Sequence, residues 1–263
     1  MDANPTILMP DVSIQNKKTN CVMKTSFLRL MNFQNWTITI ALMVVLTACL
    51  DKTEAPEQTP IGFVNLYNAA PYGTSLDVYL NDTKVNPNAP FDYSKNSGYL
   101  NFPVGSTTLK FNKYNTTTEL LESTFEVVEN KAKSLFVINE GEQVNTLILE
   151  DVSELATASH ARIRFVHLSP NPALKVDLHA KATDLADSIL FEDRSYKSNS
   201  SFLPLKSRTY TFILFDKANG SKLDSLTQEI GAGRYYTIIA KGYDPTIIPN
   251  GNNNKITLQL LNN

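Results

Sequence analysis

Hydrophobic and polar positions alternate with a period of two through most of the chain after residue 60. Tyr210, Phe212 and Leu214 share one parity, and residues 235–240 form a similar run rich in β-branched and aromatic side chains. Such alternation predicts β-strands that bury one face. Gly, Pro and Asn turn signals separate these runs, as at Asn219-Gly220, and residues 180–189 alone approach helical spacing. The pattern therefore predicts an all-β chain.

The strand pattern recurs at an interval of about 100 residues. Residues 61–66 reappear as 163–168 at an offset of 102, and residues 76–79 reappear as 176–179 at an offset of 100. Three further blocks recur in the same order, beginning at Phe102, Leu121 and Ser134. We predict a tandem duplication with units at 61–152 and 161–263, joined by a linker at 153–160. Each unit has the strand density of an Ig-like antiparallel Greek-key β-sandwich, although the Cys-Trp-Cys signature is missing.

A short apolar run at residues 36–48 ends at Cys49. It is shorter than the roughly 20 residues that span a bilayer, but it has the length of a signal-peptide core, and Lys24 and Arg29 supply the positive charge before it. The tetrapeptide Leu46-Thr47-Ala48-Cys49 looks like a bacterial lipobox, in which the cysteine thiol receives a diacylglycerol before cleavage. We predict that residues 1–48 are a lipoprotein signal peptide, with 1–22 an over-extended start, and that Cys49 is lipidated. The alternative is an ordinary signal peptide or a buried strand with an incidental cysteine.

Residues 49–60 are polar and contain proline, which is typical of a tether between a lipid anchor and a folded body. Leu50 follows the cysteine, so the aspartate that marks inner-membrane retention in some Gram-negative bacteria is missing. We therefore expect an outer-membrane lipoprotein of the cell envelope, facing the periplasm or the cell surface. A net charge of −2 and a pI of about 6.0 provide no basic field for a nucleic-acid partner.

The second unit resembles a bacterial family called domain of unknown function 4397. The resemblance rests on three motifs: residues 165–170 (Phe-Val-His-Leu-Ser-Pro), residues 176–179 (Val-Asp-Leu-His) and residues 203–205 (Leu-Pro-Leu). The first unit keeps much of the pattern, including Pro71 and Asp77, but the offset of 102 sets Asn65 against His167. The resemblance implies an exported, often lipid-anchored β-sandwich and implies no established activity.

His167 and Asp177 are the residues most suggestive of chemistry. If the strands that carry them form a hairpin, the carboxylate can orient the imidazole, as in part of a catalytic triad. The corresponding residues of the first unit are Asn65 and Asp77, and asparagine cannot exchange a proton near neutral pH. We interpret the four residues as structural polar pairs, with catalysis and ligand contact as the alternatives.

Other candidate sites are weaker. The spacing of His160, His167 and His179 matches no common zinc site, and residues 216–224 lack the acidic pattern of an EF-hand, so we expect no metal and no cofactor. Exposed tyrosine rings on a sandwich can stack on sugars, and the first unit offers several candidates: Tyr67, Tyr72, Tyr93, Tyr99 and Tyr114.

The sequence as a whole favours a non-enzymatic envelope lipoprotein. We expect a binding, adhesion or structural module that meets the membrane through its lipid anchor and takes a glycan or an envelope protein as partner. The alternative is a carbohydrate-binding accessory lipoprotein.

Overall fold

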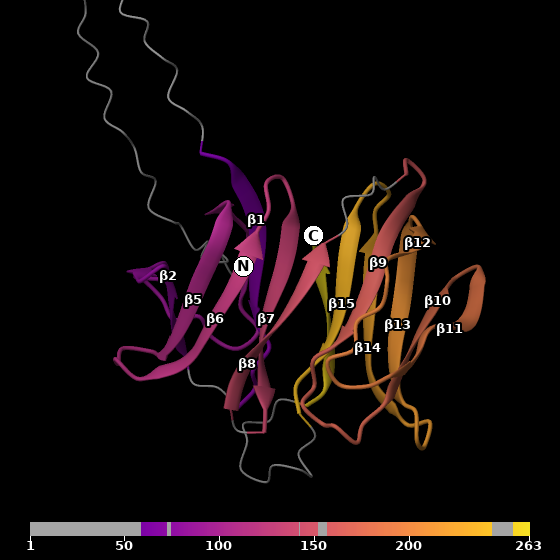
Figure 1. Cartoon of the computed structure of the whole chain (residues 1–263). Helices are drawn as coiled ribbons and strands as arrows, with labels where there is room; N and C mark the ends of the chain where they lie inside the picture. The colour runs from indigo at the N-terminus through magenta and orange to yellow at the C-terminus, as the bar shows by residue number, and fades with distance from the viewer. Residues whose placement is uncertain (1–58, 73–74, 142, 152–156, 244–254) are drawn as a thin grey trace, which may run out of the picture. The chain divides into compact units, whose positions relative to one another are not determined.

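A computed structural model of the chain describes residues 59–263, except 73–74, 142, 152–156 and 244–254. The described part holds sixteen strands and no helix, which confirms the all-β class (Figure 1). No helix in this part of the chain has the length and hydropathy needed to cross a membrane. The predicted signal peptide, Cys49 and most of the tether lie outside the described residues.

The first eight strands, here called the first half, form two four-stranded sheets with the orders β4-β1-β7-β8 and β3-β2-β5-β6. Their bounds are β1 (Ile61–Asn68), β2 (Leu76–Leu80), β3 (Thr83–Lys84), β4 (Asn96–Pro103), β5 (Gly105–Lys113), β6 (Glu119–Val127), β7 (Ala132–Glu140) and β8 (Gln143–Asp151).

The last eight strands, the second half, form sheets with the orders β12-β9-β15-β16 and β11-β10-β13-β14. Adding eight to every strand number of the first half reproduces these orders. The bounds are β9 (His160–His167), β10 (Val176–Ala182), β11 (Leu185–Arg194), β12 (Leu203–Lys206), β13 (Arg208–Asp216), β14 (Lys222–Ile230), β15 (Tyr235–Lys241) and β16 (Thr257–Asn262).

Each half buries its own hydrophobic core between its two sheets. In the first half, Val64 and Leu135 of one sheet share a cluster with Val78 and Phe111 of the other. The second half has the matching cluster, with Phe165 and Ile238 from one sheet and Leu178 and Phe212 from the other. Alternation along each strand therefore delivers one row of apolar side chains to a sandwich core, as the sequence pattern predicts.

Each half contains one parallel strand pair, whereas we expected antiparallel pairing throughout. β1 runs parallel to β7, and β9 runs parallel to β15. In both halves the chain leaves the first strand for the opposite sheet and returns before the seventh, and a crossover of this kind is what a parallel pair requires.

Gly62 lies in β1 where the β6–β7 turn approaches closely. A Cβ atom at this position would lie 2.5 Å from the carbonyl oxygen of Val128 and 2.6 Å from a methyl group of Val127. Backbone atoms cannot move aside cheaply at such a distance, so only glycine fits here.

Gly62→Ala should lower the free energy of unfolding by about 1–3 kcal/mol, because the added methyl group overpacks the site. Gly231→Ala is the matched control, because its nearest contact would be an ordinary 3.4 Å. Urea unfolding of the two variants measures the difference, and equal midpoints would contradict the steric argument.

Candidate ligand site at the junction of the two halves

His167 and Asp177 do not form the expected hairpin. His167 ends β9 and Asp177 lies in β10, and these strands belong to opposite sheets of the second half. Asp177 instead accepts a hydrogen bond from the backbone N–H of Asp193 at 2.7 Å and pairs with Lys217 at 3.2 Å. The hairpin expectation was wrong because the chain crosses between sheets after its first strand.

Asp77 has a similar role in the first half. It pairs with Lys84 at 2.8 Å and accepts a hydrogen bond from the backbone N–H of Asn115 at 3.0 Å. Both aspartates are at least 92% buried, and each ties its strand to neighbouring segments of the chain through one backbone N–H and one lysine. Within the described part of the chain, neither carboxylate forms a hydrogen bond or ion pair with a histidine.

His167 is fully buried, and its Nδ1 accepts a weak hydrogen bond from the backbone N–H of Ser169 at 3.3 Å. Its ring meets Tyr196 edge-on, with 6.4 Å between ring centroids. Burial lowers the pKa of His167 to about 4, with a small opposing effect from the backbone of Leu174. The imidazole is therefore neutral at pH 7 and enclosed, and no carboxylate among the described residues pairs with it.

The counterpart of His167 in the first half is Asn68 and not Asn65. The backbone of Asn68 bonds Lys95 and Ser94, as the backbone of His167 bonds Ser198 and Lys197. The side chain of Asn68 also accepts a hydrogen bond from an N–H two residues ahead, that of Ala70, at 3.1 Å. The structural offset between these strands is thus 99 positions, not 102.

The difference in register has a physical cause. A shift of three is odd, so it exchanges the two faces of a strand. β1 and β9 nevertheless carry apolar side chains on both faces, because the side facing away from the sandwich core is buried as well. The hydrophobic pattern therefore could not fix the register between the two strands.

The second buried face of these strands belongs to a third hydrophobic cluster, which we call the junction. Residues of both halves contribute to it: Tyr67, Ala69, Phe136, Ile138 and Leu149 from the first, and Val166, Leu168, Ile239 and Leu261 from the second. The hydroxyl of Tyr67 donates to Gln259 across it at 2.6 Å. A second hydrogen bond between the halves runs from the ammonium of Lys241 to the hydroxyl of Ser94 at 2.9 Å, and burial lowers the pKa of this lysine.

A polar network accompanies the apolar contacts of the junction. Arg164, 2% exposed, pairs with Asp151 of the first half and donates to Ser134 at 3.2 Å and to Thr237 at 2.9 Å. Its guanidinium lies 4.8 Å from the ring centre of Phe202. The charge is therefore paired and largely hydrogen-bonded, as a buried charge must be.

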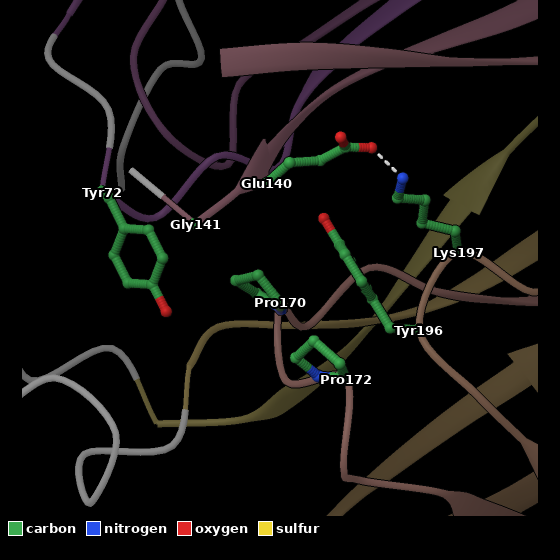
Figure 2. Close-up of a pocket in the computed structure, with 7 residues that line it drawn as sticks. All are labelled: Tyr72, Glu140, Gly141, Pro170, Pro172, Tyr196 and Lys197. Atoms are coloured by element: carbon green, nitrogen blue, oxygen red, sulfur yellow. Dashed lines mark hydrogen bonds and ion pairs between the residues drawn. The ribbon is translucent and has the colours of Figure 1, made fainter. Parts of the chain in front are cut away.

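A crevice of about 480 Å³ opens at one edge of the junction. The first half contributes Tyr72, Glu140 and Gly141, and the second contributes Pro170, Pro172, Tyr196 and Lys197 (Figure 2). The tyrosines stand on either side of the two prolines, and the ion pair of Glu140 with Lys197 crosses one side. Rigid apolar walls with a neutralised rim suit an uncharged ligand that has apolar faces.

Asn139 fixes both walls of the crevice. This residue is 1% exposed and ends the buried part of β7. Its side chain accepts a hydrogen bond from the backbone N–H of Tyr72 at 3.1 Å, and its carbonyl oxygen accepts one from the hydroxyl of Tyr196. Burial and the neighbouring Tyr72 raise the pKa of Tyr196, so its hydroxyl stays protonated and able to donate.

The tyrosines proposed as sugar platforms have other surroundings in most cases. Tyr67 is fully buried in the junction, and Tyr99 donates to Asp151 at 2.6 Å. Tyr93 faces the ammonium of Lys241 at 4.9 Å, and Tyr114 that of Lys84 at 5.7 Å. Of these five rings only Tyr72 lines the crevice. Tyr196 also lines the crevice but was not predicted from the sequence.

The residues of the other candidate sites form hydrogen bonds with residues close to them in the chain. His179 bonds Asp187 at 2.9 Å, and His160 bonds Ser159. The described residues contain no group of three or more His, Cys, Asp or Glu side chains placed to hold a metal. Residues 216–221 form the turn between β13 and β14, in which Asp216 accepts hydrogen bonds from the N–H of Ala218 and the amide of Asn219.

Comparison with known proteins gives a family match and no curated relative. Residues 62–179 match the profile of a family described as Domain of unknown function (DUF4397). No curated protein matches the chain.

Two solved structures have a distant similarity to the chain. A structure of family 41 carbohydrate-binding modules from streptococcal virulence factors, concerned with alpha-glucan recognition, shares 13% identity, covering 75% of this chain and 96% of its own, with a TM-score of 0.25. A leucine-rich repeat protein from Bacteroides thetaiotaomicron VPI-5482 shares 13% identity, covering 68% of this chain and 26% of its own, with a TM-score of 0.19.

Acid should destabilise the protein through His167. Between pH 6.5 and 4 the imidazole is protonated in the unfolded chain but stays neutral in the folded protein. The free energy of unfolding therefore falls as pH falls, by at most about 3 kcal/mol. His167→Asn should cost about 1 kcal/mol or less at pH 7, because Asn68 fills the same role, and should remove this acid loss. His160→Asn is the control and should retain it. Chemical denaturation from pH 4 to 7 measures all three, and parallel profiles for His167→Asn and the wild type would contradict the assignment.

Proposed function

We propose that the chain is an exported, lipid-anchored cell-envelope protein that acts by binding and not by catalysis. A lipid on Cys49 and the tether at 49–60 connect two β-sandwiches, related by tandem duplication, to the outer membrane. The partner is an envelope component that the crevice at the junction takes up.

The crevice is the observation that carries this proposal. Its volume of about 480 Å³ lies within the range of roughly 300–1,000 Å³ that is usual for ligand sites. Its walls come from both halves, and Asn139 holds Tyr72 and Tyr196 in place before any ligand arrives. A preformed site of this kind spends little binding energy on ordering.

A carbohydrate is the alternative ligand class, and one observation favours it. The rings of Tyr72 and Tyr196 flank the crevice, while Glu140 and Lys197 neutralise each other at its rim. A sugar presents apolar C–H faces to aromatic rings and hydroxyls to polar groups, so it matches both features. A second, polar crevice of about 460 Å³, lined by Gln228, Glu229, Arg234 and Tyr236 among others, lies in the second half and serves as a comparison site.

Lipidation is tested by replacing the cysteine of the lipobox. Cys49→Ser should leave an unprocessed precursor that takes up no labelled palmitate, because no other thiol lies at the cleavage site. Cys21→Ser is the matched control and should be labelled like the wild type, because residue 21 is removed with the signal peptide. Palmitate incorporation into the Cys49→Ser protein would disprove the anchor.

Ligand class is tested by glycan-array screening of residues 60–263. Any glycan bound in the crevice should bind at least about tenfold more weakly to Tyr196→Ala, through lost stacking, and more tightly to Tyr196→Phe than to Tyr196→Ala, because phenylalanine keeps the ring and loses only the hydrogen bond to Asn139. Arg234→Ala, in the second crevice, should leave binding unchanged. Binding lost only in Arg234→Ala would place the site elsewhere, and an array with no positive spot would remove the carbohydrate alternative.

A further inference from the structure

The junction is built from the same positions of both halves. The backbone hydrogen bonds of Phe63 to Lys131 and of Arg162 to Arg234 are equivalent, as are those of Ala69 to Val137 and of Leu168 to Ala240. The strand registers then relate the junction side chains in pairs: Tyr67 with Val166, Ala69 with Leu168, Phe136 with Ile239, and Leu149 with Leu261. Each half therefore meets the other with its own version of one surface, as the subunits of a twofold dimer do.

The polar network follows the same correspondence. Ser134 donates to Asp151 at 2.8 Å in the first half, and its counterpart Thr237 donates to Asn263 at 2.9 Å in the second. Tyr99, which donates to Asp151, corresponds to Phe202, which lies beneath Arg164. With the pair Asn65 and Arg164, these positions form a polar centre that has four equivalent positions in each half.

The charges at this centre break the symmetry. Arg164 corresponds to Asn65, and Asp151 corresponds to Asn263. One half supplies only the cation and the other only the anion, and both side chains are at least 95% buried. The neutral counterparts each keep one buried atom that has no hydrogen-bond partner among the described residues, Oδ1 of Asn65 and Nδ2 of Asn263.

We infer that the Arg164–Asp151 pair determines which halves bind each other. Two second halves joined through this surface would bury two arginines with no carboxylate, and two first halves would bury two aspartates with no cation. Burying a charge without a partner is strongly unfavourable, so both like pairings are excluded and the unlike pairing is selected. The surface thus fits one partner, the opposite half of this chain or of a second copy, and this inference is independent of any ligand in the crevice.

The test uses the full chain with a protease site in the linker at 153–160, cut after folding. The halves are allowed to exchange partners in mild urea and are then counted by native mass spectrometry. Wild-type halves should remain almost entirely as unlike pairs. In the double variant Asp151→Asn, Arg164→Asn the centre is neutral, and like pairs should rise to about half of all pairs, the statistical share.

The single variants give a sharper pattern. Asp151→Asn should permit pairs of first halves only, because second halves still carry Arg164. Arg164→Asn should permit pairs of second halves only. Lys133→Gln with Glu150→Gln is the matched control, because it removes a 3.0 Å ion pair at the surface of the first half, where Glu150 is 84% exposed, and should leave unlike pairing intact.

Three outcomes would overturn the inference. Wild-type halves that separate as folded monomers would show that the junction does not hold them. Like pairs in the wild type would show that charge does not select. Unlike pairs alone in the double variant would assign the selectivity to the apolar contacts.

Discussion

A buried ion pair between the two halves is the contact on which the arrangement of the molecule depends. Arg164 and Asp151 are both nearly inaccessible, and hydrogen bonds from Ser134 and Tyr99 satisfy the carboxylate from its own half. Removing either charge would leave the other buried and unpaired, which is far more costly than losing a surface pair. The apolar contacts around the pair supply area, and the pair itself sets which surfaces meet.

The position of the crevice follows from this junction. Its two walls belong to different halves, so the distance between Tyr72 and Tyr196 is fixed only while the halves stay together. Asn139 bridges both walls. It lies in β7, the strand that also carries Ser134 and Phe136 of the junction. We therefore expect a substitution at the polar centre of the junction to change the geometry of the crevice through β7, although no residue of this centre lines the crevice.

The sequence predicted the strands because each strand follows one rule, alternation about a buried face. It did not predict the junction, because two adjacent cores make both faces of β1 and β9 apolar and remove the alternation that fixes register. The error of three residues in aligning these strands set His167 against Asn65. The true counterpart of His167 is Asn68, and the true counterpart of Asn65 is Arg164. One signal was available: Arg164 stands in the apolar run Ile163–Val166, where a charge needs a partner from outside its own strand.

His167 shows how the corrected register changes a structural interpretation. Set against Asn65, it is interpreted as half of a structural polar pair with Asp177. Set against Asn68, it occupies a position where each half needs only an acceptor for the N–H two residues ahead, and imidazole and amide serve equally well. Asn65 instead corresponds to Arg164, at the polar centre of the junction. The two halves therefore hold interchangeable residues where each acts alone and differ in charge where they meet.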